Sequence, residues 1–557
     1  MMIKLQYITN FKFKNYLNTE KKYYLFLLIT FFILSVIGTI NHEMWRDELE
    51  AWLIAKDSYS VSNLINNLTY TGHPILWYLC LYYLAKITHN PQIMQYFHVI
   101  IITCLIFIFL YYSTFNNLQK TLFCFGCFPL YEYGIISRNY SMGILLLFIF
   151  CVLHCRKEQR YWLKAISLSL ASLTNIYCLI ISFFLASILF FKPLQVAIYN
   201  KKKLIYNKEL IASLFIYLFG LSTATIQIAS ARSALSKRAF GTAFQNTLQQ
   251  NSNHNFISLL KEYFDSSLEF EKVVNGIFRS YIPLPYSLSD SLWGTNFLTD
   301  NQHFSTIGSI NSAPLMALFL SILLFFVFIT IFARQKEVLF MYVGGTATIY
   351  IFGFIAKIPE LRHNGHLFIL LIICYWLFKY NSKHRNINIK QNHGKNKPLN
   401  FFSFIKRQQE IALTIILSIQ LYAGIKMYTL DLILPFSNIY DVAQFIEKAQ
   451  LEDSLIVGTS DLKVFPISAW LNKEIYYPEI ADFGTFTVWT PQSVSRNSNT
   501  TESEIFRQIQ KLKKSEHQNL ILVTDKQLEF DNLSLNLINS FQKPSLIGET
   551  FFVYTVD

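Results

Sequence analysis

Charged residues are scarce in this sequence of 557 residues, because Asp, Glu, Lys and Arg together make up only 15% of it. Soluble globular chains carry nearer a quarter. Hydrophobic residues make up 52%, and the mean hydropathy is +0.31. This balance argues against an ordinary soluble protein and places the chain in the membrane class.

Acidic residues are fewer than basic ones, 35 against 48, so the net charge is +13. In a soluble protein this excess would suggest a nucleic-acid partner. Here Lys and Arg instead cluster in short segments between apolar stretches, which is typical of loops that stay on the cytoplasmic side of a membrane. We therefore expect no nucleic acid among the partners.

The sequence also gives no sign of a disulfide framework or of a glycine-rich phosphate loop. The eight cysteines all lie in apolar stretches, and neither a long polar loop nor the C-terminal tail holds one, so no disulfide framework is expected. Cys124 and Cys127 form a CxxC motif, but their apolar surroundings favour helix packing over metal binding. The chain also has no glycine-rich phosphate loop.

Long apolar runs are abundant. The first, 23–40, follows a basic N-terminus that should stay cytoplasmic, so residue 42 should emerge outside. Segment 73–88 is predicted to lie in the membrane interface or to dip in and out without crossing, because all later basic clusters then fall inside. The remaining predicted spans bring the total to about 11 crossings: 94–115, 121–137, 139–155, 163–175, 177–191, 209–229, 313–333, 338–356, 364–380 and 410–430.

The fold class is therefore a polytopic α-helical membrane protein whose transmembrane domain covers 1–430, with extracytoplasmic loops 42–93 and 230–312. The tail, 431–557, is predicted to be a small extracytoplasmic α/β domain. Its expected helices are 441–450, 462–471 and 505–514. Its expected strands are SLIVGT, TFTVW, NLILVT and FFVYTV.

The motif MWRDELEAW, residues 44–52, places acidic residues directly after the first span. Arg46, Asp47, Glu48 and Glu50 would lie at the outer membrane surface. A carboxylate at the rim of a low-dielectric cavity is a candidate general base, and a cluster of carboxylates is also a candidate ligand for a divalent cation. The simpler alternative is a helix start whose acidic residues complement the helix dipole.

Two basic groups are predicted on the same side. His73 precedes Pro74 in TGHPILWY and is a candidate to donate to a phosphate. Arg138, in SRNY, lies between two apolar spans, where an arginine needs a partner such as Glu132 or a lipid phosphate. The simpler explanation for His73 is a helix entry, and the simpler explanation for Arg138 is snorkelling to the membrane interface.

A third group of candidates lies farther along the chain. Arg362, His363 and His366 cluster in LRHNGHLF at the outer end of two spans, where positive charge opposes the usual topological bias. An anionic ligand would offset that charge, although Glu360 or lipid headgroups would also do so. The break between two short spans, at Asn175 and Tyr177, indicates an internal cavity on the outer side.

The order of these motifs resembles the GT-C class of membrane glycosyltransferases over about residues 20–380. The order is DE, HP-x-L-W-Y, S-R-N-Y, a broken T-N-x-Y, and R-H-N-G-H-L-F. The nearer relatives would be the bacterial lipid-linked-sugar transferases of the RgtA/B/C/D-like kind. Protein O-mannosyltransferases and the aminoarabinose transferase of lipid A are more distant.

The resemblance implies transfer of a sugar from a polyprenyl-phosphate donor to an extracytoplasmic glycan, lipid or protein, with inversion. Asp47 would be the general base with Glu48 assisting, and His73, Arg138 and Arg362 would contact the donor phosphate. Position 72 is glycine here, where relatives often carry an acidic residue. The other cavity-lining candidates are Arg46, Tyr140, Asn175, Tyr177, His363 and His366.

The resemblance also implies a location in a membrane, most simply a bacterial inner membrane. No cofactor is assigned, and a divalent metal stays open. Two other functions use the same features: a transporter or flippase for a lipid-linked substrate, and a surface-polysaccharide ligase or polymerase. The last would place its essential residues in the large outer loop, where Arg232, Arg238, His254 and His303 are the candidates.

Overall fold

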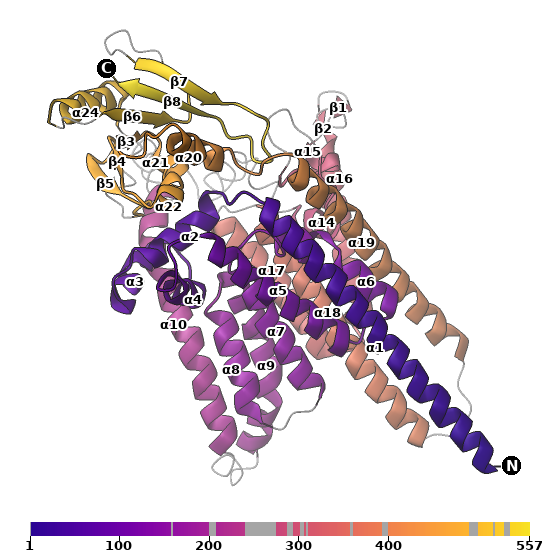
Figure 1. Cartoon of the computed structure of the whole chain (residues 1–557). Coiled ribbons are helices and arrows are strands. Elements are labelled where there is room, and N and C mark those ends of the chain that lie inside the picture. Colours follow the sequence, from indigo (N-terminus) through magenta and orange to yellow (C-terminus); the bar gives the residue numbers. More distant parts are fainter. Residues whose placement is uncertain are drawn as a thin grey trace.

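The computed structural model describes residues 2–156, 160–199, 208–239, 275–286, 293–300, 306–307, 310–356, 360–392, 399–489, 500–515, 519–528 and 535–556. Long helices form a bundle, and a small mixed sheet covers one end of it (Figure 1). The helices of the first half are α1 (Met2–Asn41), α2 (Arg46–Lys56), α3 (Val61–Leu68), α4 (Leu76–Ala85), α5 (Gln92–Tyr112), α6 (Asn117–Cys124), the π-helix η1 (Cys127–Glu132), α7 (Tyr140–Cys155), α8 (Tyr161–Ser172), α9 (Ile176–Tyr199) and α10 (Lys208–Ala239). Then come α14 (Gly276–Tyr281), α15 (Phe297–Asp300), the two-residue strands β1 (Thr306–Ile307) and β2 (Ile310–Asn311), α16 (Ser312–Phe332), α17 (Lys336–Ala356), α18 (Leu361–Asn392) and α19 (Leu399–Ile433).

Seven of the described helices are long and apolar enough to cross a membrane, so the chain is an integral membrane protein. The spans are Thr19–Asn41, Gln92–Tyr112, Lys208–Ser230, Leu315–Phe332, Lys336–Ala356, Leu361–Lys383 and Gln408–Ile433. Large apolar side chains such as Phe26 and Ile33 stay exposed along the outer helices, as expected where lipid replaces water. The predicted total of about 11 also counted 121–137, 139–155, 163–175 and 177–191. These form shorter or interrupted helices, so that total stays a prediction.

The α18 helix is the centre of the bundle. Most of its apolar side chains are buried, and they belong to one large core with α5, α7, α9 and α17. This position matters because α18 begins with Arg362 and His363, at the end of the bundle that carries the tail. The predicted break is confirmed nearby, since α8 ends at Ser172 and α9 starts at Ile176.

The segment 73–88 forms only the ten-residue helix α4. At 1.5 Å per residue it is about 15 Å long, roughly half the thickness of the hydrocarbon core. Its buried side chains Trp77 and Leu81 pack in one core with α2 and with tail residues such as Val442 and Val553. The α4 helix therefore supports the tail domain at the end of the bundle.

The tail consists of α20 (Ile439–Lys448), β3 (Leu455–Gly458), α21 (Asp461–Val464), α22 (Ile467–Leu471), β4 (Ile475–Tyr477), β5 (Asp482–Gly484), α24 (Glu502–Ser515), β6 (Leu520–Thr524), β7 (Leu535–Phe541) and β8 (Phe551–Val556). The sheet order is β5-β4-β3-β6-β8-β7. Strand β3 pairs in parallel with β4 and β6, and the outer pairs are antiparallel. The expected strand TFTVW is wrong: residues 485–489 pair with no strand in the described chain and pack against α2 instead.

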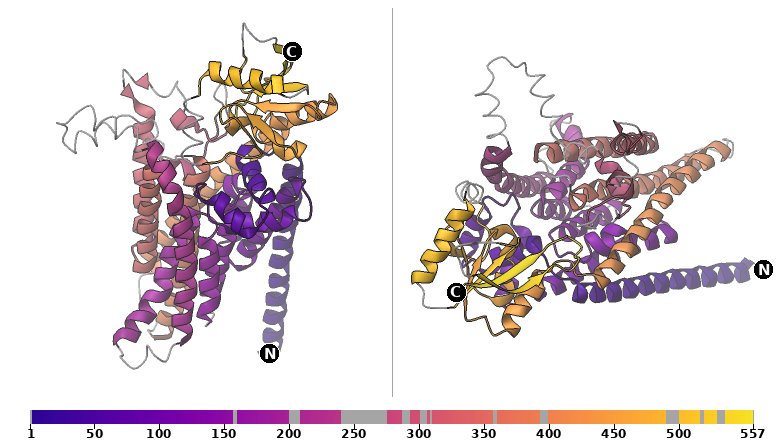
Figure 2. Two further views of the ribbon diagram at one scale, coloured as in Figure 1. Left: turned by 90° about the vertical axis from the view of Figure 1, so that its left-hand side faces the viewer. Right: turned by 90° about the horizontal axis from the view of Figure 1, so that it is seen from above.

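Alternation along the strands builds three layers in the tail. Val457, Leu522 and Tyr554 face α24 on one side of the sheet. Ile521 and Val553 face the other side, toward α20, α22 and the bundle. The tail lies at the end where α1 and α19 finish, opposite the N-terminus (Figure 2).

Candidate active site at the start of α2

The site begins where the chain leaves α1 and turns into α2. Asp47 and Glu48 lie in the first turn of α2, where carboxylates complement the positive end of the helix dipole. Successive helical residues point about 100° apart, because the helix has 3.6 residues per turn. Asp47 keeps 19% of its side chain exposed, whereas the Glu48 side chain is fully buried.

Asp47 is the centre of a charge cluster drawn from three distant segments. Its Oδ2 lies 3.0 Å from a terminal guanidinium nitrogen of Arg362 and 3.5 Å from one of Arg138. Arg138 also donates to the backbone carbonyl of Asp47. The Nε of Arg46 lies 3.6 Å from Oδ1. The structure therefore brings together the predicted base and two of its predicted phosphate ligands.

These arginines determine the ionisation of Asp47. Burial by itself would raise the pKa of this carboxyl, but Arg362 and Arg138 outweigh burial and lower the pKa below its ordinary value. The pKa of Arg138 is raised in turn, because the charge of Asp47 outweighs the burial of the guanidinium. Asp47 is thus a carboxylate at neutral pH, although its partners reduce its basicity.

Glu48 belongs to a separate, buried network that the sequence did not predict. Its Oε1 accepts the backbone N–H of Ser137 at 2.6 Å, and its Oε2 lies 3.1 Å from Nε2 of His42. Nδ1 of the same imidazole lies 2.8 Å from Oδ2 of Asp431, at the end of α19. Burial alone would lower the pKa of His42, but the carboxylates of Asp431 and Glu48 raise it to about 10. The network thus joins the ends of α1 and α19 to α2.

Arg362 packs against two indole rings that contact each other, with ring centroids 4.8 Å apart. Its guanidinium carbon lies 5.1 Å from the ring centroids of both Trp45 and Trp293, which is cation–π geometry. The indole N–H of Trp293 donates to Glu132 at 2.9 Å. The expected pairing of Glu132 with Arg138 is therefore wrong, because Trp293 binds Glu132 and Asp47 binds Arg138.

His73 lies next to the charge cluster and stacks on Tyr78, with ring centroids 6.2 Å apart. Burial, followed by the positive charge of Arg138, lowers the pKa of His73 to about 3. The imidazole is therefore neutral, so it offers a phosphate one N–H donor and no positive charge.

Four of the predicted cavity-lining residues form an aromatic group beside Arg362. The Tyr177 ring stacks on His366 at 4.7 Å and on His363 at 5.5 Å, and Tyr140 packs edge-on against His366 at 5.2 Å. The Oη atoms of both tyrosines, Nδ1 of His363 and Nε2 of His366 are buried and have no hydrogen-bond partner among the described residues. Buried polar atoms of this kind are normally satisfied by water or by a ligand.

Asn175 differs from the other candidates. Its Oδ1 accepts the backbone N–H of Cys178 at 2.9 Å, and its Nδ2 lies near Thr174 and the Cys178 sulfur. These contacts are those of a residue that begins a helix, here α9. The structure therefore gives the side chain of Asn175 a capping role.

A metal site at α2 is not supported by the donor set. Among the described residues, no group of three or more His, Cys, Asp or Glu side chains is placed to hold a metal. The Asp47 carboxylate is engaged by arginines, and Glu48 is engaged by His42. These residues do not fit a divalent cation.

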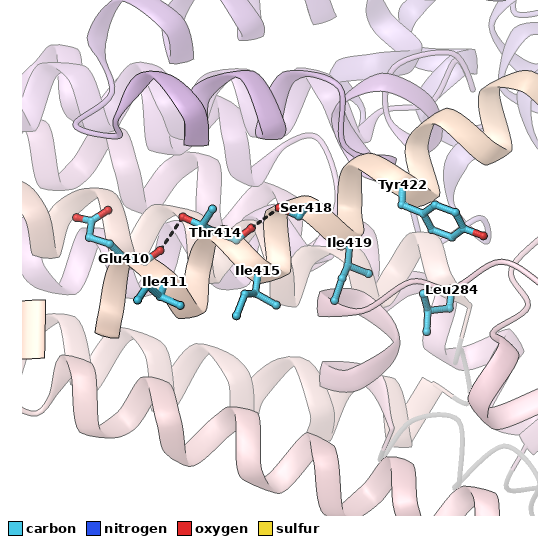
Figure 3. Close-up of a pocket in the computed structure, with 8 residues that line it drawn as sticks. All are labelled: Leu284, Glu410, Ile411, Thr414, Ile415, Ser418, Ile419 and Tyr422. Carbon is cyan, nitrogen blue, oxygen red and sulfur yellow. Dashed lines mark hydrogen bonds between the residues drawn. The ribbon is translucent and has the colours of Figure 1, made fainter. Parts of the chain in front are cut away.

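The alternative candidates in the outer loop are only partly described. Arg232 and Arg238 belong to α10, whose side chains are not described there, and His254 and His303 lie outside the described residues. A groove of about 510 Å³ runs along α19, lined by Leu284, Glu410, Ile411, Thr414, Ile415, Ser418, Ile419 and Tyr422 (Figure 3). None of these eight residues belongs to the Asp47 cluster.

Fold and site together define an integral membrane protein with a carboxylate–arginine cluster at the end of the bundle that the tail covers. No family model and no curated protein matches the sequence. Two crystal structures of ArnT from Cupriavidus metallidurans are similar to the chain, each over 96% of this chain and 98% of that chain. The structure bound to undecaprenyl phosphate has a TM-score of 0.44 and 11% identity, and the apo structure has 0.41 and 10%. At these values the functional assignment has to rest on this chain's own residues.

Proposed function

We propose that this protein is a GT-C-class membrane glycosyltransferase that moves a sugar from a polyprenyl-phosphate donor to an acceptor outside the cytoplasm, with inversion. One observation carries the proposal: Asp47 is bound by Arg362 and Arg138, which come from segments far apart in the sequence. A carboxylate beside two arginines provides a base and a phosphate-binding fork within one cluster.

The ion pairs suggest how the donor would activate the base. The phosphodiester of the donor carries one negative charge, as a carboxylate does, and its two free oxygens fit the guanidinium fork, so it competes with Asp47 for Arg138 and Arg362. When the arginines turn to the phosphate, the lowering of the Asp47 pKa is relieved and its basicity rises. Donor binding would thus raise the proton affinity of the base at the moment when the donor phosphate is in place.

The chemical step then needs one proton acceptor and one stabilised leaving group. The acceptor hydroxyl gives its proton to Asp47, and its oxygen attacks the anomeric carbon from the face opposite the phosphate. The bond between that carbon and the phosphate oxygen breaks, and the phosphate leaves with the electron pair. Arg138 and Arg362 meet the charge that develops on it. Attack from the opposite face inverts the anomeric centre.

Neighbouring side chains have supporting roles in this proposal. His73 is neutral, so it would contribute a single hydrogen bond to the phosphate. Tyr140, Tyr177, His363 and His366 present buried polar atoms that sugar hydroxyls would satisfy. Glu48 is a positioning residue: it binds the N–H of Ser137, the residue before Arg138, and so fixes the two halves of the cluster relative to each other.

The proposed setting is a bacterial inner membrane, with the N-terminus cytoplasmic and the tail outside. The tail and the Asp47 cluster lie at the end of the bundle opposite the N-terminus, which agrees with this orientation (Figure 1). Donor and acceptor would then meet at the outer leaflet, and no nucleotide would be needed.

The test is deletion of the gene followed by mass spectrometry of surface glycans and lipids. We expect one surface glycan to lose a sugar and a lipid-linked donor to accumulate. Wild-type protein should restore both, and Asp47→Asn should restore neither. Glu504→Gln is the matched control, because Glu504 is a half-exposed carboxylate on α24 whose described partners, Arg507 and Gln508, lie on the same helix. Unchanged glycans in the deletion strain would refute the proposal.

A further inference from the structure

A second carboxylate lies one helical turn beyond Asp47. Residues three apart on a helix are neighbours on its surface, so Glu50 shares a face with Asp47. The indole N–H of Trp489 donates to Oε1 of Glu50. Trp489 belongs to the tail segment after β5, which contacts α2 again where Thr485 donates to Asp57. The tail therefore reaches into the cluster and holds one of its carboxylates.

The surroundings of Glu50 give it a proton affinity different from that of Asp47. Burial is the largest effect on its pKa and, with repulsion from Asp47, raises it to about 7 despite the hydrogen bond from Trp489. Glu50 also interacts electrostatically with Arg138, Arg46 and Tyr78. Asp47, in contrast, has a lowered pKa.

The difference in pKa between Asp47 and Glu50 affects where the acceptor's proton goes after sugar transfer. Under the proposed function, Asp47 takes a proton from the acceptor hydroxyl while the arginines are turned to the phosphate. Once the polyprenyl phosphate has left the site, the arginines pair with Asp47 again, and that pairing favours the ionised carboxylate. The proton must then leave Asp47, and Glu50, which lies on the same face of α2 and has the higher proton affinity, is placed to receive it.

We propose that Glu50 is the second carboxylate of the site, which takes the proton from Asp47 after sugar transfer, and that Trp489 of the tail positions it. The O–H bond of the Asp47 carboxylic acid breaks and an O–H bond on the Glu50 carboxylate forms, with no change of oxidation state. Water then removes the proton from Glu50 before the next turnover. This inference rests on the proposed glycosyltransferase function.

The test measures sugar transfer as a function of pH, using purified protein mixed with membranes of the gene-deleted strain. Those membranes supply both the accumulated donor and the unmodified acceptor. The wild-type rate should rise through pH 7 as Glu50 ionises. In Glu50→Gln, which keeps an oxygen acceptor for Trp489, the rate should fall by about 10²-fold at pH 8 and the rise through pH 7 should vanish.

The variant Trp489→Phe tests the positioning role. It removes the N–H donor together with the rest of the pyrrole ring but keeps an aromatic side chain, so the pKa of Glu50 should rise and the midpoint should move up by about one pH unit. Trp470→Phe is the matched control in the tail, because the Trp470 N–H has no hydrogen-bond partner among the described residues. A purely structural role for Trp489 would lower the rate without moving the midpoint, and that result overturns the positioning claim.

A titration without substrate separates this inference from the proposed function. The emission of Trp489, taken as the difference between wild type and Trp489→Phe, should change near pH 7 and become independent of pH in Glu50→Gln. If wild-type protein transfers sugar and Glu50→Gln keeps the same pH profile, the Glu50 proposal is wrong and the glycosyltransferase proposal stands. Absence of transfer by wild-type protein rejects both.

Discussion

Asp47 and Glu48 are adjacent in the sequence, yet the structure places them in two different regions. Asp47 lies in a partly exposed cluster whose partners are arginines. Glu48 lies in a sealed network with His42 and a backbone N–H. One region has cations that a phosphate can draw away, and the other has fixed bonds between helix ends. In the proposed mechanism, Asp47 is therefore the group that changes partners during the reaction, and Glu48 is the group that holds the helix ends in place.

The contrast has a physical basis in the helix itself. Neighbouring residues on α2 face directions about 100° apart, so one carboxylate meets the cluster and the other meets the buried face. Buried ion pairs keep their geometry because breaking them leaves an uncompensated charge. A partly exposed pair exchanges partners at lower cost, since water can solvate the group that is released.

The substitution Asp47→Asn should have the largest effect on activity, and it tests whether Asp47 takes part in the reaction. It keeps the size and shape of the side chain but removes the base, so sugar transfer should fall by about 10²–10⁴-fold. The thermal unfolding midpoint should fall less than in Glu48→Ala, because Asp47 and Arg362 keep 19% and 14% of their side chains exposed whereas Glu48 and His42 keep none. Mass spectrometry of the acceptor gives the rate, and a variant that transfers sugar as the wild type does removes Asp47 from the mechanism.

Glu48→Ala should show the opposite pattern, with a large loss of stability and a smaller loss of activity. Removing one partner of a buried charge network costs about 3–5 kcal/mol of unfolding free energy. We expect a clearly lower unfolding midpoint in detergent, together with reduced yield. Transfer per folded molecule should fall less than in Asp47→Asn. If Glu48→Ala unfolds at the wild-type temperature and is inactive, Glu48 acts directly in the reaction.

Arg362→Lys sharpens the description of the exchangeable region. Lysine keeps the charge but loses the planar fork and its packing against Trp45 and Trp293. We expect transfer to fall by about tenfold, mostly as weaker donor binding, since a point charge replaces a bidentate contact. Arg507→Lys on the exposed α24 helix is the control. Equal activity of Arg362→Lys and wild type would show that the fork does not bind the phosphate.

The smallest expected effect is a pH dependence of stability in the fixed region. The pKa of His42 is raised to about 10 in the folded protein from an ordinary value near 6.5, so its contribution is full below that ordinary value. It is lost as the pH rises through 10. The unfolding midpoint should therefore decline by a few degrees between pH 7 and 9. His42→Gln should lack the decline, and an unchanged slope in that variant would assign it to other groups.

The sequence was a good guide to which helix ends would meet. Alternating crossings place the ends of the first span, of 121–137 and of 338–356 on one side, and the structure joins Asp47, Arg138 and Arg362 at that end. The tail was also recognisable, because short apolar strands alternate with amphipathic helices along the sequence. Periodicity carries this information at the level of whole elements.

Individual side chains were harder to place. Two adjacent acidic residues do not reveal which carboxylate faces the cluster, so the sequence predicts Glu48 only as a residue that assists Asp47. Trp489 and Trp293 carry no sequence signal for their bonds to Glu50 and Glu132, because these contacts depend on tertiary packing. The expected strand TFTVW failed for the same reason, since its last residue bonds to α2.

The most direct measurement is the anomeric configuration of the product. Purified protein in lipid vesicles would receive the accumulated donor and the unmodified acceptor from the gene-deleted strain, and NMR would compare the transferred sugar with the donor. If Asp47 activates the acceptor while Arg138 and Arg362 hold the leaving phosphate, the new linkage has the opposite configuration. A retained configuration, or an intact donor that moves between leaflets with no new bond, would contradict the account.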